Sequence, residues 1–553
     1  MHPNVIPSFW RRVSSVGARL TAPLALLAAL LFHIPPLEAQ VFRSDDPVRV
    51  DRDDRPVQRP RRRKINDYWD FVENTFLRKP SRMKSRAVNI NTLGEVPDSS
   101  WYTNRIGIRE LSRDELVRGP DRDEGPAPGG WTVVSGKSQG ISPGFRVRDS
   151  RGVQYFVKFD PISNPEMATG AEIISTKFFH ALGYNVPENY LVELDPSKLS
   201  VAPEATVQNE LGQDVPLTME MTRSLLDKIA RKADGRVRAI ASKQIRGDDL
   251  GPFKFFGTRR DDANDVFPHE HRRELRGYYI FCSWLNHDDS RSINTQDFYV
   301  GAPGEGHVRH YLIDFGSTLG SGSIFAQKRR PGNEYMWEAK PTFASIASLG
   351  LWRRPWVNVE YPEFPSIGRF EADYFQPEKW KPEYPNAAFR EMDLEDAFWA
   401  ARQMLRFRDG DIEAVVKTAR FSNPLAEAYL TQCLIKRRDK MGNYWLRRTC
   451  PLDNFRIEGD SIRFDDLLVV AGYSARMAEW RVRFESFDNG TGARSQLGGE
   501  SRAGENRVVL PAPVREASSG SYFVVHFSNA GQTLDLFLRR EMEGLRIVGL
   551  QRK

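Results

Sequence analysis

The stretch from Trp284 to Gly316 reads W-L-N-H-D-D-S-R-S-I-N-T-Q-D-F-Y-V-G-A-P-G-E-G-H-V-R-H-Y-L-I-D-F-G. Asp289 and Asn294 stand five positions apart in an H-x-D-x-x-x-x-N pattern, and Asp314 directly follows a short apolar run. Carboxylate and amide oxygens are hard ligands of the kind that Mg²⁺ prefers. We therefore predict that Asn294 and Asp314 hold a divalent metal, and that Asp289 accepts a proton from an attacking hydroxyl.

The spacing between the two predicted metal ligands suits a β-hairpin. Twenty positions separate Asn294 from Asp314. Two runs of strand-forming residues, 297–300 and 308–313, lie in that interval and are joined by a G-A-P-G turn. An Asp-rich turn is more often a solvated loop than a site, but here the order, the separation and the strand context agree. We expect the hairpin to hold both ligands at its ends.

Residues 131–195 are typical of a small β-rich unit. Its predicted strands are 131–136, 145–148, 153–159 and 189–193. The loop between the first two strands carries Gly136, Gly140 and Gly144. A glycine-bearing loop of this kind lays backbone N–H groups against phosphates, so these glycines are candidate nucleotide-binding residues.

A lysine lies near the end of the third of these strands. Lys158 stands in Y-F-V-K-F-D, where its neighbours are apolar. Burying a lone ammonium group is costly, so Lys158 needs an anionic partner. The next predicted helix, 167–182, contains Glu172, which we expect to form this ion pair. Glu166, just before the helix, is the alternative partner, and in a second alternative both acids are simply solvated.

Four segments together resemble the protein-kinase-like superfamily, and most closely its atypical branch, the HipA-like and CotH-like kinases. They are V-K-F-D, A-E-I-I-S-T-K-F-F-H-A-L-G-Y-N-V-P, N-H-D-D-S-R-S-I-N and L-I-D-F-G. The resemblance covers roughly residues 131–450. It implies ATP, Mg²⁺ or Mn²⁺, and a two-lobed fold.

The resemblance also implies a role for each candidate residue. Lys158 contacts phosphates and Glu172 orients Lys158. Asp289 is the catalytic base, and Asn294 and Asp314 hold the metal.

Two features depart from the pattern of the resembled kinases. The spacing of the glycine loop does not match G-x-G-x-x-G. Asp288 occupies a position where many kinases have arginine, and it competes with Asp289 as the candidate base.

The fold class that we expect is α+β. It comprises a two-lobed protein-kinase-like fold, with a small β-rich lobe and a large helical lobe, followed by a C-terminal all-β domain. The expected parts are a signal peptide or anchor at 1–40, a disordered basic linker at 41–85, a nucleotide-binding lobe at 86–205, a lobe with the catalytic loop at 206–450, and a β-sandwich-like domain at 451–553. Residues 351–390, rich in aromatic residues and proline, either wrap the fold or build a substrate surface, and we favour wrapping.

The beginning of the chain has the charge order of an export signal. Arg11, Arg12 and Arg19 precede an apolar run at 20–34 that is short for a membrane span. We expect a periplasmic or cell-envelope protein, with an uncleaved anchor as the alternative. The basic run Arg55–Lys64 either contacts an anionic envelope surface or is a solvated spacer.

Composition places the chain among globular proteins. It has 553 residues, 40% hydrophobic and 28% charged, with a net charge of +7 that is modest for this length. We expect no nucleic-acid partner. Three cysteines exclude a disulfide scaffold, although Cys433 and Cys450 would be able to pair in an oxidising compartment.

Two functions remain open at this point. The first is an exported kinase-like phosphotransferase, or a relative that transfers another part of ATP, whose acceptor is a protein, a sugar or a lipid. The alternative is a catalytically silent cell-envelope binding protein that retains the fold. The complete Lys-Glu-Asp-Asn-Asp set favours the first, whereas export favours the second because ATP is scarce outside the cytoplasm.

Overall fold

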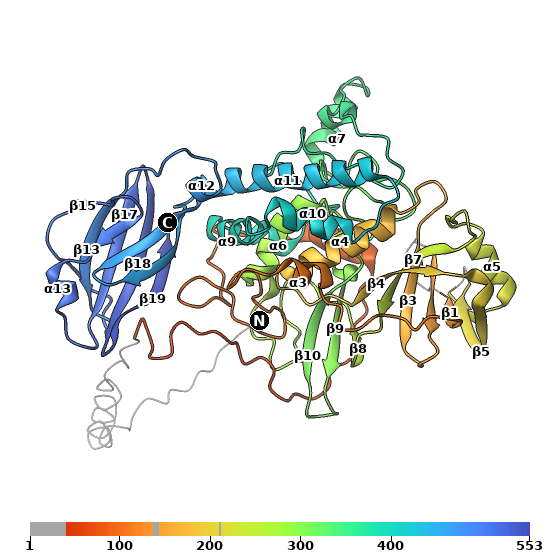
Figure 1. Ribbon diagram of the computed structural model, residues 1–553, viewed down its shortest axis with the longest axis horizontal. Helices are drawn as coiled ribbons and strands as arrows, with labels where there is room; N and C mark the ends of the chain where they lie inside the picture. Colours follow the sequence, from red (N-terminus) through yellow and green to blue (C-terminus); the bar gives the residue numbers. More distant parts are fainter. Residues whose placement is uncertain (1–39, 137–142, 210–211) are drawn as a thin grey trace, which may run out of the picture.

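The computed structural model describes residues 40–136, 143–209 and 212–553, and its fold is mixed α+β (Figure 1). Along the long axis of Figure 1, two C-terminal sheets, a helical body and a seven-stranded sheet follow one another. Apart from residue 40, the predicted export segment lies outside the described residues, as does Gly140. Within the described ranges, no helix is long and apolar enough to span a bilayer.

The seven-stranded sheet has the strand order β4-β7-β3-β2-β1-β5-β6. Its strands are β1 (Trp131–Gly136), β2 (Gly144–Arg148), β3 (Gln154–Phe159), β4 (Asn189–Leu194), β5 (Leu199–Gln208), β6 (Asp214–Pro216) and β7 (Val237–Lys243). The four strands predicted from residues 131–195 are therefore present. The sheet also continues past the lobe boundary expected at residue 205, because β7 pairs with both β3 and β4.

Helix α4 (Met167–Ala181) connects β3 to β4 and agrees with the predicted helix. It ends before Gly183, whose φ of 108° favours glycine. A Cβ at this position would also come within 2.2 Å of the Tyr102 ring. Phe178 and Phe179 of α4 belong to the largest hydrophobic core, which includes residues of α6 (Arg273–Leu285), α9 (Leu394–Met404), α10 (Asp409–Lys417) and α11 (Pro424–Leu446). The helix is thus fixed against the helical body as well as against the sheet.

The helical body lies in the middle of the molecule. Its main helices are α3 (Arg113–Arg118), α6 (Arg273–Leu285), α8 (Ala387–Glu391), α9 (Leu394–Met404), α10 (Asp409–Lys417) and α11 (Pro424–Leu446). Short elements elsewhere in the chain are α5 (Met219–Leu226) and the turns η2 (Pro196–Lys198), η3 (His269–His271), η4 (Ser292–Asn294) and η5 (Pro355–Asn358). The three cysteines are free and buried, so the Cys433–Cys450 disulfide is not formed.

A three-stranded antiparallel sheet at the edge of the body contains the predicted hairpin. Its strands are β8 (Asp248–Gly251), β9 (Thr295–Val300) and β10 (His307–Leu312). In the hairpin, Thr295 pairs with Leu312 and Val300 pairs with His307. The predicted hairpin is therefore present, and Asn294 and Asp314 both lie at its open end, just before β9 and just after β10.

Residues 452–552 form two antiparallel sheets around one hydrophobic core. The elements are β11 (Leu452–Glu458), β12 (Ser461–Asp466), α12 (Leu467–Val470), β13 (Arg481–Phe487), β14 (Arg494–Gln496), β15 (Ser501–Arg502), β16 (Arg507–Val509), α13 (Ala512–Arg515), β17 (Tyr522–Asn529), β18 (Gln532–Glu541) and β19 (Gly544–Arg552). Two short helices interrupt the strands, so the region is β-rich rather than purely β.

The segment 41–85 does not form the disordered linker that its composition predicts. It contains α2 (Asp67–Val72) and the π-helical turn η1 (Glu73–Leu77). Phe42 is buried against aromatic rings of the C-terminal sheets. Within the basic run, Arg59 and Arg62 form ion pairs with two aspartates of β8, at 2.6 and 2.9 Å. The segment is ordered because acids and aromatic rings from distant parts of the chain fix it, although it has no apolar periodicity of its own.

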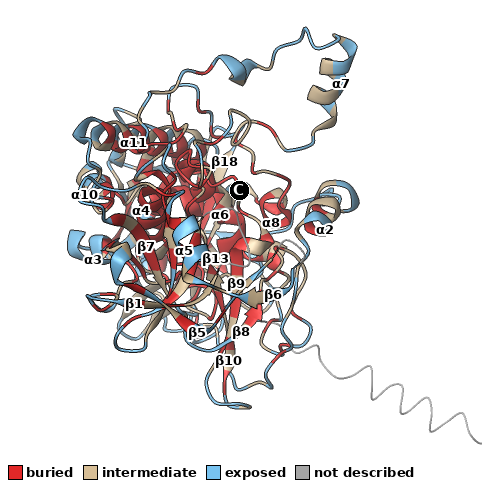
Figure 2. Cartoon of the chain, turned by 90° about the vertical axis from the view of Figure 1, so that its right-hand side faces the viewer, coloured by how far each residue is buried: buried red, intermediate tan, exposed pale blue. Residues whose placement is uncertain are grey.

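The region after D-F-G divides into two parts. Residues 359–390 include core residues such as Phe370, Phe375 and Trp380, so this part wraps the fold. Residues 335–358 instead project from the body and carry α7 (Ala339–Ala347), as Figures 1 and 2 show. Exposed surface predominates over this projection, in contrast to the buried centre of the molecule (Figure 2).

Candidate functional site

The predicted ion pair between Lys158 and Glu172 is present. Lys158 Nζ lies 3.2 Å from Glu172 Oε2 and 2.7 Å from Asp314 Oδ1. The alternative partner, Glu166, instead accepts a hydrogen bond from the backbone N–H of Ser422. One ammonium group thus joins β3, α4 and the residue that opens the D-F-G sequence.

The electrostatics of Lys158 follow from this geometry. Burial alone would lower the pKa of Lys158, but the carboxylates of Asp314 and Glu172 outweigh burial and raise the pKa above its usual value. The lysine is therefore a permanent cation at neutral pH, which is the state needed to bind phosphate oxygens.

Glu172 is held from two further sides. Asn189 Nδ2 of β4 donates to Glu172 Oε1 at 3.2 Å and also to the Thr176 hydroxyl at 2.8 Å. Gly316 approaches the same carboxylate so closely that a Cβ there would lie 3.3 Å from Glu172 Oε2. The orientation of Glu172 is thus built into the packing of α4 against β4 and the D-F-G turn.

Asn294 and Asp314 are brought together by the hairpin. The backbone N–H of Ile313 donates to the carbonyl of Asn294 at 3.0 Å. Asp314 has a φ of 63°, a left-handed conformation that is uncommon outside glycine and often marks a functional position. Phe315 is buried and packs on Phe179, with ring centroids 4.7 Å apart, and on His287, at 5.7 Å. These rings fix the D-F-G turn against α4 and against His287.

Asp289 lies in a partly open position on the candidate catalytic loop, residues 287–294. Asn294 Nδ2 donates to its carbonyl at 2.7 Å, and the Ser317 hydroxyl donates to Oδ2 at 3.3 Å. Arg291 forms an ion pair with the carboxylate. Burial raises the pKa of Asp289 to about 6, while Arg291 opposes the shift and Glu383 adds to it. A carboxylate with this pKa is matched to accepting a proton near neutral pH.

Sequence reasoning missed the charges around Arg291. Arg291 Nη1 lies 2.8 Å from Asp67 Oδ2 of α2 and 3.2 Å from Glu383 Oε2. Three carboxylates thus share one guanidinium next to the candidate base. The only local sign of this cluster in the sequence is Arg291 itself, two positions after Asp289. Asp67 and Glu383 come from distant parts of the chain.

Asp288 is placed differently from Asp289. It is buried and accepts a hydrogen bond from Gln327 Nε2 at 2.6 Å, while its backbone carbonyl accepts from the N–H of Glu383. Burial, and then the neighbouring Asp289, raise the pKa of Asp288 well above its usual range. Asp288 is therefore a structural acid of the loop, and Asp289 is better placed as a base.

Two of the three candidate glycines are terminal strand residues: Gly136 ends β1 and Gly144 begins β2. A Cβ at Gly144 would come within 2.3 Å of the Val157 carbonyl oxygen, and one at Gly136 within 2.4 Å of the Val207 side chain. Close packing in the sheet is thus sufficient to require glycine at both positions. Gly140 lies in the part of the loop outside the described residues.

The oxygen donors fit a divalent metal of the magnesium type. Asp314 offers a carboxylate that already pairs with a cation, and Asn294 offers an amide whose nitrogen is fixed by Asp289. Mg²⁺ commonly takes one or two protein ligands and completes its shell with water and phosphate. Among the described residues, no group of three or more His, Cys, Asp or Glu side chains is placed to hold a metal ion. The pair of Asp314 and Asn294 is a smaller site of a different kind, with one carboxylate and one amide.

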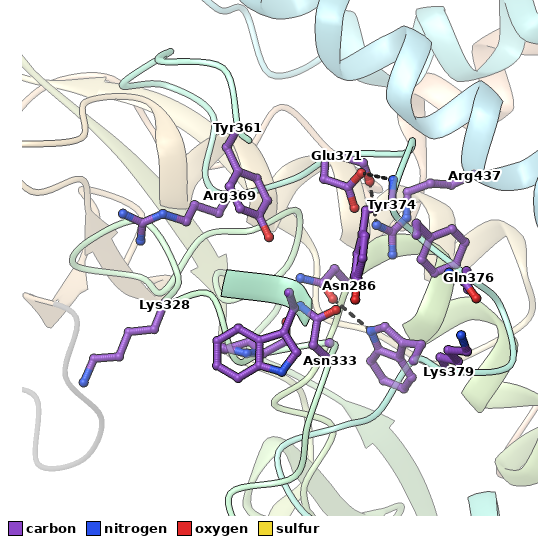
Figure 3. A pocket seen from close by; sticks show the side chains of 15 residues that line it. Asn286, Lys328, Asn333, Tyr361, Arg369, Glu371, Tyr374, Gln376, Lys379 and Arg437 are labelled. Carbon is purple, nitrogen blue, oxygen red and sulfur yellow. Dashed lines mark hydrogen bonds between the residues drawn. The ribbon is translucent and has the colours of Figure 1, made fainter. Parts of the chain in front are cut away.

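Figure 3 shows a cavity lined in part by Asn286, which directly precedes the candidate catalytic loop. Trp380 Nε1 donates a hydrogen bond to Asn286 Oδ1 at 2.8 Å, and Asn286 Nδ2 donates to the side-chain oxygen of Gln327. Gln327 Nε2 in turn donates to Asp288 Oδ1. The cavity measures about 90 Å³, room for about three water molecules at roughly 30 Å³ each. It is too small for a nucleotide, so we interpret it as part of the support of the loop.

A larger hollow opens between α5 and the segments next to the site. It measures about 710 Å³ and is lined by Pro143, Pro161, Ile324 and residues of α5. This volume is within the range of about 300–1,000 Å³ found for small-molecule sites. Pro143 precedes Gly144, which pairs with Lys158 in the sheet. Lys158 and Asp314 line neither cavity.

No family model matches the chain, and no curated protein matches it. Among solved structures, the chain is similar to the crystal structure of a Helicobacter pylori proinflammatory kinase, CtkA, with 15% sequence identity and a TM-score of 0.30. The similarity covers 56% of this chain and 94% of that chain. At this TM-score the similarity carries no argument about activity.

Proposed function

We propose that the chain is an exported, kinase-like phosphotransferase that uses ATP and Mg²⁺ or Mn²⁺. The observation that carries the proposal is the position of Lys158, between a helix glutamate and the aspartate of D-F-G. Protein kinases use this arrangement to hold the phosphates of ATP. The proposal requires a two-lobed kinase-like fold. The seven-stranded sheet, the hairpin and the candidate catalytic loop would supply its residues.

Each candidate residue then has one task. Lys158 donates to phosphate oxygens, and Glu172 keeps the lysine in position. Asp314 and the Asn294 amide oxygen hold the divalent metal, which supplies charge neutralisation on the phosphates when bound. Asp289 takes the proton of the acceptor hydroxyl, while Asn294 and Ser317 fix the loop that carries it. The acceptor is a protein, a sugar or a lipid in the cell envelope.

Nucleotide and metal are expected to bind together. Asp314, which pairs with Lys158, would also hold the metal, and phosphate oxygens would then offer Lys158 further anionic partners. Calorimetric titration of ATP with Mg²⁺, with Mn²⁺ and with a chelator would measure this dependence. Tight binding only in the presence of metal supports the proposal. No metal-dependent binding in the parent protein would favour the silent envelope binding protein instead.

Phosphoryl transfer is expected to increase as the pH rises through about 6. Asp289 acts as a base only when it is deprotonated, so the rate should fall about tenfold for each pH unit below this pKa. Initial rates of labelled-phosphate transfer, to any acceptor including the protein itself, would give the profile. Arg291→Gln should move this limb to higher pH, because Arg291 lowers the pKa of Asp289. A flat profile in the parent protein would contradict Asp289 as the base.

A further inference from the structure

A 24-residue segment leaves the body of the protein and returns to it. We call residues 335–358 the α7 projection (Figures 1 and 2). The structure describes every one of these residues, and none of them is buried. Glu334 and Val359, on either side of the segment, are buried. The projection is therefore anchored at its base and has no contact that covers its tip.

The tip of the α7 projection is strongly apolar. The exposed fractions are 69% for Phe343, 65% for Ile346, 92% for Leu349 and 85% for Leu351. Phe343 and Ile346 are three positions apart on α7 and so share one face of the helix. Single exposed apolar residues are ordinary, but four large ones within nine positions indicate a binding surface.

The charge around the tip is of one sign. Residues 339–358 contain Lys340, Arg353 and Arg354 but no aspartate or glutamate. Arg354 is used at the base, where it lies 2.8 Å from Glu334, whereas Lys340 and Arg353 are exposed. Trp352 is exposed as well and lies between the apolar tip and these arginines. Apolar side chains bordered by tryptophan and cations are typical of elements that enter the membrane interface.

We propose that the α7 projection inserts into the surface of a bilayer that contains anionic lipid. Lipid can surround a convex tip on all sides, whereas a rigid protein surface covers only one side of it. A second copy of the chain would bring cations against cations. Negatively charged headgroups complement Lys340 and Arg353 while the acyl region accepts Phe343, Ile346 and Leu349. This inference stands on the projection alone and does not depend on the proposed catalytic activity.

The test uses a local probe on the full-length chain, because the apolar run at 20–34 would itself bind vesicles. The native cysteines are buried, so Leu349→Cys offers an accessible thiol for a polarity-sensitive fluorophore. Met542→Cys, on the exposed turn between β18 and β19, is the matched control. Vesicles of phosphatidylcholine with phosphatidylglycerol are compared with vesicles of phosphatidylcholine alone.

The expected result is a blue shift of the probe at position 349 with the anionic vesicles and none at position 542. No shift at position 349 would overturn the proposal. A shift without vesicles that grows with protein concentration would overturn it in favour of self-association. A shift caused equally by neutral vesicles would contradict the role of charge.

Two sets of variants in the labelled protein separate the contributions. Phe343→Ser together with Ile346→Ser should remove the shift. Lys340→Gln and Arg353→Gln should each weaken binding to anionic vesicles about fivefold, with a smaller loss at high salt. Leu425→Ser removes an exposed apolar residue elsewhere and should change nothing. Full retention of the shift in the serine variant would refute insertion.

Discussion

Replacing Lys158 by alanine is expected to lower the affinity for ATP about 10- to 100-fold in the presence of Mg²⁺, because charge-assisted hydrogen bonds to the phosphates are lost. The variant also leaves Glu172 and Asp314 side by side without the cation that now lies between them. Their mutual repulsion should disfavour the approach of a polyanion further. Calorimetric titration of parent and variant with Mg²⁺ and ATP gives the ratio of affinities.

Lys177→Ala is the matched control for this change. Lys177 lies on the same helix as Glu172 and forms a buried ion pair with Asp121 at 3.1 Å. Its removal should lower the melting temperature but leave the affinity for ATP as in the parent. The assignment of Lys158 is wrong if Lys158→Ala binds ATP as tightly as the parent does.

Replacing Asp289 by asparagine should reduce phosphoryl transfer by about 10²–10⁴-fold, the usual contribution of a general base. Binding of ATP should stay nearly unchanged, because the proposed metal ligands, Asn294 and Asp314, are untouched. The Asn294 side chain donates to the backbone carbonyl of Asp289, which the substitution retains, so the loop should keep its shape. Labelled-phosphate transfer and nucleotide binding must be measured on the same preparation.

Asp288→Asn discriminates between the two adjacent acids. Asp288 accepts from Gln327 through an oxygen that asparagine also has, and its carboxyl has a pKa well above the usual range. Asparagine therefore resembles the protonated acid, and we expect little loss of transfer. If Asp288→Asn instead lost transfer as strongly as we expect for Asp289→Asn, the base would be Asp288.

The parts of the site that the sequence predicted are those whose geometry is local. The hairpin needs only its own strands and turn to place Asn294 beside Asp314. The pair of Lys158 and Glu172 needs one strand and the helix that follows it. In both cases the periodicity of apolar residues and a few turn residues carry enough information.

The parts that could not be predicted depend on distant contacts. Asp67 reaches Arg291 across 224 positions, and Arg59 reaches Asp248 across 189. Neither pair leaves a periodic pattern in the sequence. The seven-stranded sheet extends past the lobe boundary expected at residue 205 for a related reason. Strands β5 and β6 and helix α5 come between β4 and β7, so the strand that joins β3 to β4 in the sheet comes late in the sequence.

The buried contact of Phe42 has a consequence for the order in which the chain is made. Its backbone N–H donates to Asn489 Oδ1, 447 positions later, and its ring packs on Phe487 and Phe537. A growing polypeptide cannot form these contacts until the C-terminal sheets have been synthesised. The same N-terminal segment carries Asp67 to the candidate catalytic loop. A prematurely terminated chain would therefore lack the rings and the amide that hold Phe42, at the start of the segment that leads to Asp67.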